Sequence, residues 1–209
     1  MNGSSHTAIG AAGGFIVANS VQAAPAATLF LVGLGSVAGL VPDLDIDGKL
    51  AGRITLSHTV IRTVAQLIGV LMIFYSFYES AGIKDSLWGI GIGALIIGIA
   101  SAIKQKHMLT LTGVGVTVGG LPLDEMWLIL MGIYIIVASF VPHRSYTHSI
   151  IGVIFFAVIA SKLEESLGIN GVYYTCLIGY ISHLVADSRF LPFNRRGVKL
   201  LLPISSREF

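Results

Sequence analysis

The sequence predicts an all-α fold, a polytopic membrane bundle of about eight short transmembrane helices. Of its 209 residues, 54% are hydrophobic and only 11% are charged. This composition, with a mean hydropathy of +0.83, lies outside the range of ordinary soluble domains. The apolar residues also gather into runs close to the length of about 20 residues that a helix needs to cross a bilayer. No break in composition marks a second domain, so residues 1–209 are expected to form one integral membrane domain.

Seven apolar runs are candidate spans because they contain few charges. The three clearest lie near residues 60–78, 86–103 and 125–141. Four shorter runs, rich in Gly and Ala, lie near residues 7–22, 26–41, 149–162 and 171–187. Glycines recur at four-residue spacing, which predicts close helix packing in lipid. These pairs are Gly10/Gly14, Gly35/Gly39, Gly89/Gly93 and Gly115/Gly119.

An eighth span is predicted at His107 to Gly120, although its residues alternate enough to resemble a strand. An isolated hairpin would leave unpaired backbone groups in lipid, so a short helix is the cheaper structure. Fourteen residues rise about 21 Å as a helix, which makes this a thin span.

The distribution of Lys and Arg supports eight spans, since these residues concentrate in cytoplasmic loops. With seven spans the basic residues divide almost evenly between the two faces. With eight, one face carries Lys49, Arg53, Arg62, Lys104, Lys106, Arg144, Arg189, Arg195, Arg196, Lys199 and Arg207, and the other carries Lys84 and Lys162. The topology with eight spans therefore predicts a protein of the inner, cytoplasmic membrane with both termini in the cytoplasm.

Polar segments interrupt the chain at the ends of three hydrophobic runs, at residues 41–45, 142–149 and 183–187. Ionisable groups are costly in a membrane and therefore suggest function. With His6, these segments hold most of the histidines and several acids, and imidazole with carboxylate suits zinc, manganese or a similar divalent ion. His58 and His107 fall outside the segments and are expected to be interfacial.

His183 and Asp187 are spaced i, i+4, so both side chains leave one face of a helix and can hold one ion or two adjacent ions. The alternative is an aspartate that accepts a hydrogen bond from a buried histidine. His143 and His148 flank a turn opened by Pro142, and Thr147 or Ser145 is expected to cap the following helix.

Asp43, Asp45 and Asp47 alternate, so an extended segment would place their carboxylates on one side. His6 precedes the first run, and by itself it is more typical of a terminal surface residue than of a metal ligand. With eight spans, all these groups meet at one membrane face, which predicts a metal site there.

The segments resemble the YdjM-like, LexA-regulated membrane-bound metal-dependent hydrolases. The likeness rests on Pro42-Asp43-Leu44-Asp45, on His143-Arg144 with Thr147-His148-Ser149, on Gly179-Tyr180-Ile181-Ser182-His183 with Asp187, and on the tail Gly197 to Pro203. It covers the chain to about residue 203, apart from an added membrane region near residues 50–140. Ser145 departs from the family pattern, in which Gly is usual.

This resemblance implies a helical fold distantly related to zinc phospholipase C, with one to three divalent ions, zinc or alternatively manganese. The metal ligands that it implies are His6, Asp43, Asp45, His143, His148, His183 and Asp187. The expected activity is hydrolysis of a phosphoester in a membrane lipid or lipid-linked substrate. Asp45, or alternatively Asp43, would orient water or act as base, and Arg144 would hold a phosphate or simply anchor the cytoplasmic face.

Two further classes remain open on the residues alone. One is a membrane transporter that binds a metal, and the other is a scaffold that a metal stabilises without catalysis. A transporter predicts ionisable residues near the middle of several spans, whereas here they lie at one face. No nucleic-acid partner is expected, and the sequence does not specify the oligomeric state.

Overall fold

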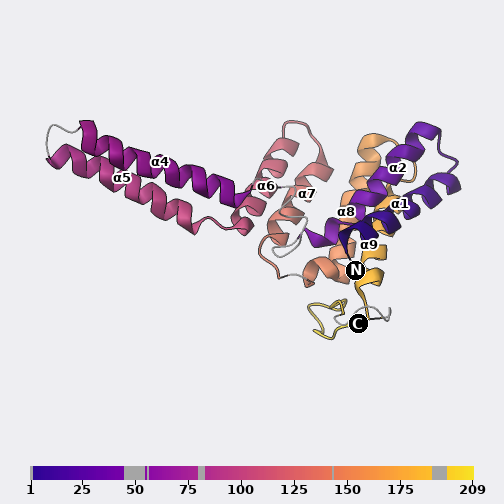
Figure 1. Cartoon of the computed structure of the whole chain (residues 1–209). Helices are drawn as coiled ribbons and strands as arrows, with labels where there is room; N and C mark the ends of the chain where they lie inside the picture. The colour runs from indigo at the N-terminus through magenta and orange to yellow at the C-terminus, as the bar shows by residue number, and fades with distance from the viewer. Residues whose placement is uncertain (1, 45–54, 56, 80–82, 143, 190–196) are drawn as a thin grey trace. The chain divides into compact units, whose positions relative to one another are not determined.

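The computed structural model describes residues 2–44, 55, 57–79, 83–142, 144–189 and 197–209, and these residues confirm the all-α prediction. They form eight α-helices, two 3-10 helices and no strand (Figure 1). The elements in chain order are α1 (Gly3–Ser20), α2 (Pro25–Ala38), η1 (Val41–Asp43), α4 (His58–Glu79), α5 (Ile83–Ala102), α6 (Gln105–Gly120), α7 (Met126–Ala138), η2 (Tyr146–His148), α8 (Ile150–Leu167) and α9 (Val172–Asp187).

The chain divides into two compact units, residues 1–51 with 109–209, and residues 52–108. The second unit is built on α4 and α5, which run side by side in Figure 1. They approach closely, because a Cβ atom added at Gly69 would lie 2.7 Å from the carbonyl oxygen of Gly93. Large apolar side chains such as Phe74 and Leu71 of α4 are mostly exposed, as expected for a helix that faces lipid. An added membrane region over residues 50–140 stays a prediction.

Among the described residues, two helical segments are long and apolar enough to cross a membrane, Pro25–Asp43 and His58–Tyr78. The helices Leu87–Ala102 and Gln105–Gly120 pass the same test only as a pair, which would add one span at most. The stretch His107 to Gly120, which was predicted as an eighth span, is helical and forms most of α6. The count of eight crossings stays a prediction.

In the first unit, α1, α2 and α9 pack against one another and α8 packs against α9 (Figure 1). The core between them contains apolar side chains that are almost completely buried. Among them are Leu31, Ala160, Val172 and Cys176. These helices lie close enough for side chains at their ends to meet.

Glycine brings α1 and α2 into backbone contact, as the four-residue spacing predicts. A Cβ atom added at Gly10 would lie 2.1 Å from the carbonyl oxygen of Gly35, and one added at Gly14 would lie 2.3 Å from that of Leu31. Gly115 and Gly119 differ, because no described atom lies within 4 Å of an added Cβ at either. The spacing therefore indicates packing correctly for α1 and α2 but not for α6.

The ends of the helices carry local signals that fix where each begins. The side chain of Asn2 accepts a hydrogen bond from the Ser5 amide at 3.0 Å at the start of α1, and Pro25 is the first residue of α2. Ser149 caps α8 by accepting from the Gly152 amide. The prediction that Thr147 or Ser145 caps this helix was wrong, because Ser149 is the N-cap residue, and Thr147 lies within the 3-10 turn η2 and Ser145 just before it.

Candidate metal centre

Histidine and aspartate side chains converge where α1 begins, α2 ends, α8 begins and α9 ends. They come from His6 in the first turn of α1, Asp43 in η1, His148 in η2, and His183 and Asp187 in the last turns of α9. Both His148 and His183 are completely buried, and His6 and Asp187 are nearly so. Buried ionisable groups need partners. In the first unit, these histidines and aspartates are partners for one another.

His183 is oriented by a carbonyl group at the end of α2. Its Nδ1 lies 2.7 Å from the oxygen of Gly39. The last carbonyls of a helix have no partner within it, and a carbonyl oxygen can only accept. His183 Nδ1 therefore carries the proton, and in the neutral ring Nε2 presents a lone pair. This arrangement is typical of histidines that bind metals in proteins.

The Nε2 atom of His183 forms a triangle with two other candidate ligand atoms, one from His148 and one from Asp43. His183 Nε2 lies 3.2 Å from His148 Nε2 and 3.5 Å from Asp43 Oδ1, and the third side, His148 Nε2 to Asp43 Oδ1, is 3.6 Å. Ligands of tetrahedral zinc, with bonds of about 2.0–2.1 Å, are separated by about 3.3 Å. The triangle therefore has the dimensions of one face of such a site. Lone pairs at these distances require a proton or a cation between them.

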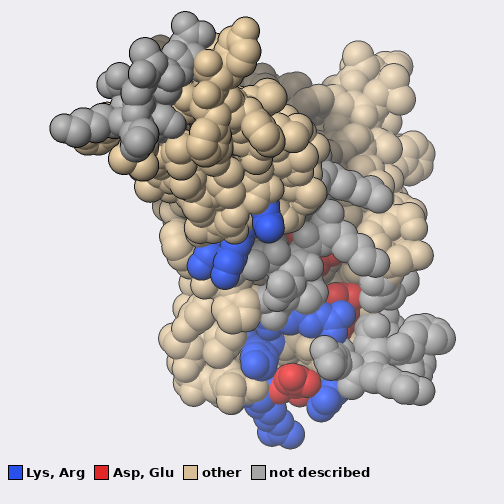
Figure 2. Space-filling view, turned by 60° about the vertical axis from the view of Figure 1, so that its left-hand side comes forward, with Lys and Arg blue, Asp and Glu red and all other residues tan. Residues whose placement is uncertain are grey.

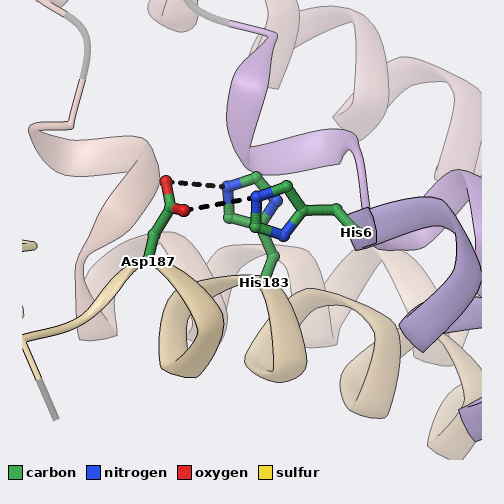
Figure 3. A group of neighbouring side chains, drawn as sticks. All are labelled: His6, His183 and Asp187. Carbon is green, nitrogen blue, oxygen red and sulfur yellow. Dashed lines mark ion pairs between the residues drawn. The ribbon is translucent and has the colours of Figure 1, made fainter. Parts of the chain in front are cut away.

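A second group adjoins the triangle and shares His183 with it (Figure 3). His6 Nε2 lies 3.3 Å from Asp187 Oδ1, and the rings of His6 and His183 stack with centroids 3.8 Å apart. His183 Nε2 lies 3.9 Å from Asp187 Oδ2. His6 Nδ1 is buried and has no hydrogen-bond partner among the described residues. This group also contains the ligand types that hold a divalent ion.

His183 can serve only one of the two groups at a time, because a neutral imidazole has one lone pair and its other nitrogen is bound to Gly39. The negative charge of Asp187 is already balanced by Arg144, whose Nη2 donates a hydrogen bond to Asp187 Oδ2 at 3.0 Å. The triangle with Asp43 and His148 has the more even distances. The geometry thus favours the triangle for an ion that His183 binds.

Arg144 has a left-handed backbone conformation, with φ of 59°. Outside glycine this conformation costs of order 1–3 kcal/mol and persists where surrounding contacts impose it. The ion pair with Asp187 is one such contact. From the sequence, Arg144 was expected to hold a phosphate or to anchor the cytoplasmic face, and its ion pair with Asp187 was not predicted. The pair brings the turn before η2 against the end of α9.

Buried hydroxyl groups hold the turn that carries His148. Tyr180 donates a hydrogen bond to the Thr147 carbonyl, and the Tyr134 hydroxyl lies 3.0 Å from that of Tyr180. Thr147 Oγ1 in turn lies 3.1 Å from His148 Nδ1. Sequence reasoning assigned no role to Tyr180. Its position one turn before His183, on the same helix face, was the signal available.

The structure brings together five of the predicted ligands, His6, Asp43, His148, His183 and Asp187, with Arg144 beside them. Asp45 and His143 lie outside the described residues, so their roles stay predictions. The extended conformation that would align the alternating aspartates is not found at Asp43, because this residue ends the 3-10 helix η1 and its amide donates to the Leu40 carbonyl.

His58 and His107 belong in sequence to the other unit, residues 52–108. His58 Nδ1 lies 2.7 Å from Gln105 Oε1, and the Lys104 amide donates to His107 Nδ1. Neither histidine belongs to either group of ligand types found among the described residues. Both therefore serve as control positions for the site.

The whole chain, residues 1–209, matches the family model described as YdjM inner membrane protein. The chain belongs to this family. Membership supports a location in the inner membrane. A search of curated proteins found no match, and a search of solved structures found none either.

Proposed function

We propose that this member of the YdjM family is a metal-dependent hydrolase of the inner membrane, which acts on a phosphoester. The observation that supports it most directly is the triangle of Asp43 Oδ1, His148 Nε2 and His183 Nε2, with sides of 3.2–3.6 Å. Two nitrogen ligands and one carboxylate oxygen suit zinc, and manganese is the alternative. Three protein ligands are also the usual set in catalytic zinc sites, which keep a position for water or substrate.

Access to the site supports a reaction rather than a purely structural ion. The side chain of Asp43 is 19% exposed, whereas the rings of His148 and His183 are completely buried. Water and substrate would therefore approach from the side of the carboxylate. A bound divalent cation stabilises the negative charge that develops on phosphoryl oxygens and activates water for attack. Asp45, or alternatively Asp43, is proposed to orient that water or accept its proton.

Arg144 is proposed to bind a phosphoryl oxygen of the substrate. Its guanidinium is 24% exposed while it pairs with Asp187 at 3.0 Å, so it lies at the border between the buried ligands and solvent. A planar guanidinium matches phosphate oxygens with two parallel hydrogen bonds, which an ammonium group cannot do. A membrane lipid or a lipid-linked phosphate is the proposed substrate class, because the site lies at the end of an apolar span.

The proposed orientation places both termini and the metal centre in the cytoplasm. Its support is the division of Lys and Arg that eight spans produce. It agrees with the convergence of His6 with Asp187, since the start of α1 and the end of α9 lie together in the first unit.

The proposal is tested by assaying phosphoesterase activity of purified protein with zinc or manganese, on phospholipids, lipid-linked phosphates and nucleotides. Asp43→Asn and His148→Ala should each abolish turnover, because loss of a ligand removes both charge and geometry. Asp187→Asn should abolish it too, because this change removes the carboxylate that pairs with Arg144 and His6 beside the triangle. His58→Ala and His107→Ala are matched controls and should retain wild-type activity.

Arg144→Lys separates phosphate binding from a topological role, since it keeps the positive charge and loses the planar fork. We expect it to lower activity strongly while membrane insertion stays normal. Full activity in this variant would make Arg144 a topological anchor. If wild type turns over none of these phosphoesters, a transporter or a scaffold stabilised by a metal becomes the better account of the site.

A further inference from the structure

The C-terminal segment, residues 197–209, is attached by its backbone to two of the helix ends that form the metal centre. The amide of Ile150, the first residue of α8, donates to the Leu200 carbonyl at 2.9 Å. The amide of Arg189, two residues after the end of α9, donates to the Phe209 carbonyl at 2.9 Å. Val198 is completely buried. The segment is therefore part of the folded unit.

Between these attachments the chain makes an apolar turn, Leu201–Ile204, whose residues are exposed except for Leu202, which is half-buried. The Ser205 amide closes the turn by donating to the Leu201 carbonyl at 3.0 Å. Ile204 is 92% exposed, more than any other large apolar residue described, and Leu201 and Pro203 are exposed too. Exposed apolar side chains on a short turn are costly in water, so a partner that covers them is expected.

The position of the turn indicates that this partner is the membrane. The apolar span Pro25–Asp43 ends at Asp43, whose Oδ1 lies 3.6 Å from His148 Nε2. Ile150, which holds the turn through Leu200, lies two residues after His148. The apolar turn is therefore tied to the level at which a membrane span ends. Apolar side chains at that level can enter the boundary between headgroups and acyl chains.

The charges beside the turn favour an anionic bilayer surface. Lys199 precedes the turn and Arg207, which is exposed, follows it. The only carboxylate side chain of the segment, Glu208, is paired with Arg189 at 3.0 Å and does not oppose these cations. Figure 2 shows Lys and Arg surface in separate blue patches on this face, some of them beside red Asp and Glu surface, with large tan areas elsewhere. Cations that flank an inserted apolar group bind anionic lipid headgroups.

We propose that the apolar turn Leu201–Ile204 inserts into the headgroup boundary of the membrane at the face of the metal centre, with Lys199 and Arg207 at the level of the lipid phosphates. The turn thereby fixes the depth of the centre relative to lipid headgroups. This inference does not depend on hydrolase activity.

The test measures the depth of a spin label at Ile204→Cys in full-length protein reconstituted into vesicles of phosphatidylcholine mixed with phosphatidylglycerol. Cys176, the one native cysteine, is 2% exposed and should not react with the label. Ser206→Cys is the matched control, since Ser206 is exposed on the same segment outside the turn. Relaxation by oxygen, which partitions into lipid, is compared with relaxation by a water-soluble nickel chelate.

The label at position 204 should relax more with oxygen than with the chelate, and the label at position 206 should show the reverse. A label at position 204 that the chelate reaches as well as it reaches position 206 would overturn the proposal. So would a label that neither reagent reaches, which would indicate contact with protein. In vesicles of phosphatidylcholine alone, or in a Lys199→Gln/Arg207→Gln variant, the ratio of oxygen to chelate relaxation should fall. An unchanged ratio would contradict the role given to the two cations.

Discussion

At the scale of single residues, the candidate site depends on how the lone pair of His183 is directed. The Gly39 carbonyl fixes the protonated nitrogen, so the opposite nitrogen faces His148 and Asp43. The i, i+4 spacing was enough to predict from sequence that His183 and Asp187 share a face. The partnership with Gly39 was not predictable in the same way, because the two residues lie 144 positions apart. Such contacts follow from tertiary packing and leave no local pattern.

The hydroxyl pair Tyr134 and Tyr180 allows the support of His148 to be tested. A hydroxyl has one proton, and that of Tyr180 goes to the Thr147 carbonyl, so Tyr134 is the donor between the two tyrosines. Tyr180→Phe removes the bond to the turn and should weaken metal binding by about 10- to 100-fold, as for other residues that orient ligands. Tyr134→Phe leaves the bond between Tyr180 and the Thr147 carbonyl in place and should weaken metal binding less.

The measurement is metal affinity by competition with a chelator, together with the melting temperature of the metal-free protein. Tyr180→Phe removes the bonds of its hydroxyl to Thr147 and to Tyr134, so it should lower the melting temperature more than Tyr134→Phe, which leaves the bond to Thr147 in place. Equal metal affinity in the two variants would show that Tyr180 does not position His148.

At the scale of helices, glycine contacts determine which ends meet. A Cβ atom added at Gly179 would lie 2.8 Å from the Ala38 side chain and 2.9 Å from the Gly35 carbonyl. This close approach of α9 to α2 places His183 against Gly39. The four-residue spacing of glycines predicted close packing but could not name partners, because it describes one surface of one helix.

Gly35→Ala tests this packing against Gly33→Ala on the same helix. An alanine at position 35 would place its methyl group 2.3 Å from the Gly10 carbonyl, whereas position 33 has no described atom within 4 Å. Gly35→Ala should destabilise the protein by about 1–3 kcal/mol through overpacking. Gly33→Ala should be neutral or stabilise it by up to about 1 kcal/mol, since alanine favours helix. Thermal unfolding in detergent measures both, and equal melting temperatures would argue against the contact of α1 with α2.

At the scale of the whole molecule, hydropathy predicted an all-α membrane protein correctly and placed helices close to their observed limits. The spans predicted at residues 149–162 and 171–187 correspond to α8 and α9, for example. The number of crossings could not be settled in the same way. Several helices in the described part of the chain are shorter than a bilayer requires, and a short apolar helix has the same composition whether it spans, bends or packs against others.

The topology proposal makes a direct prediction for α6. A reporter fused after Lys106 should be cytoplasmic, and one fused at Asp124 should be external, because α6 then crosses between them. The expectation rests on the concentration of Lys and Arg on one face when the chain crosses eight times. If both reporters lie on the same side, residues 107–120 do not cross, and the topology with eight spans is wrong.

The central claim is that the buried histidines and aspartates hold a divalent metal ion, and the most direct measurement is the metal content of detergent-purified protein by elemental analysis. Wild type and the control His58→Ala should carry stoichiometric metal. His183→Ala and the less disruptive His183→Gln should lose it, since both remove the nitrogen that faces His148 and Asp43. Absence of metal from wild type after purification with zinc or manganese, or equal metal in all four proteins, would contradict the account.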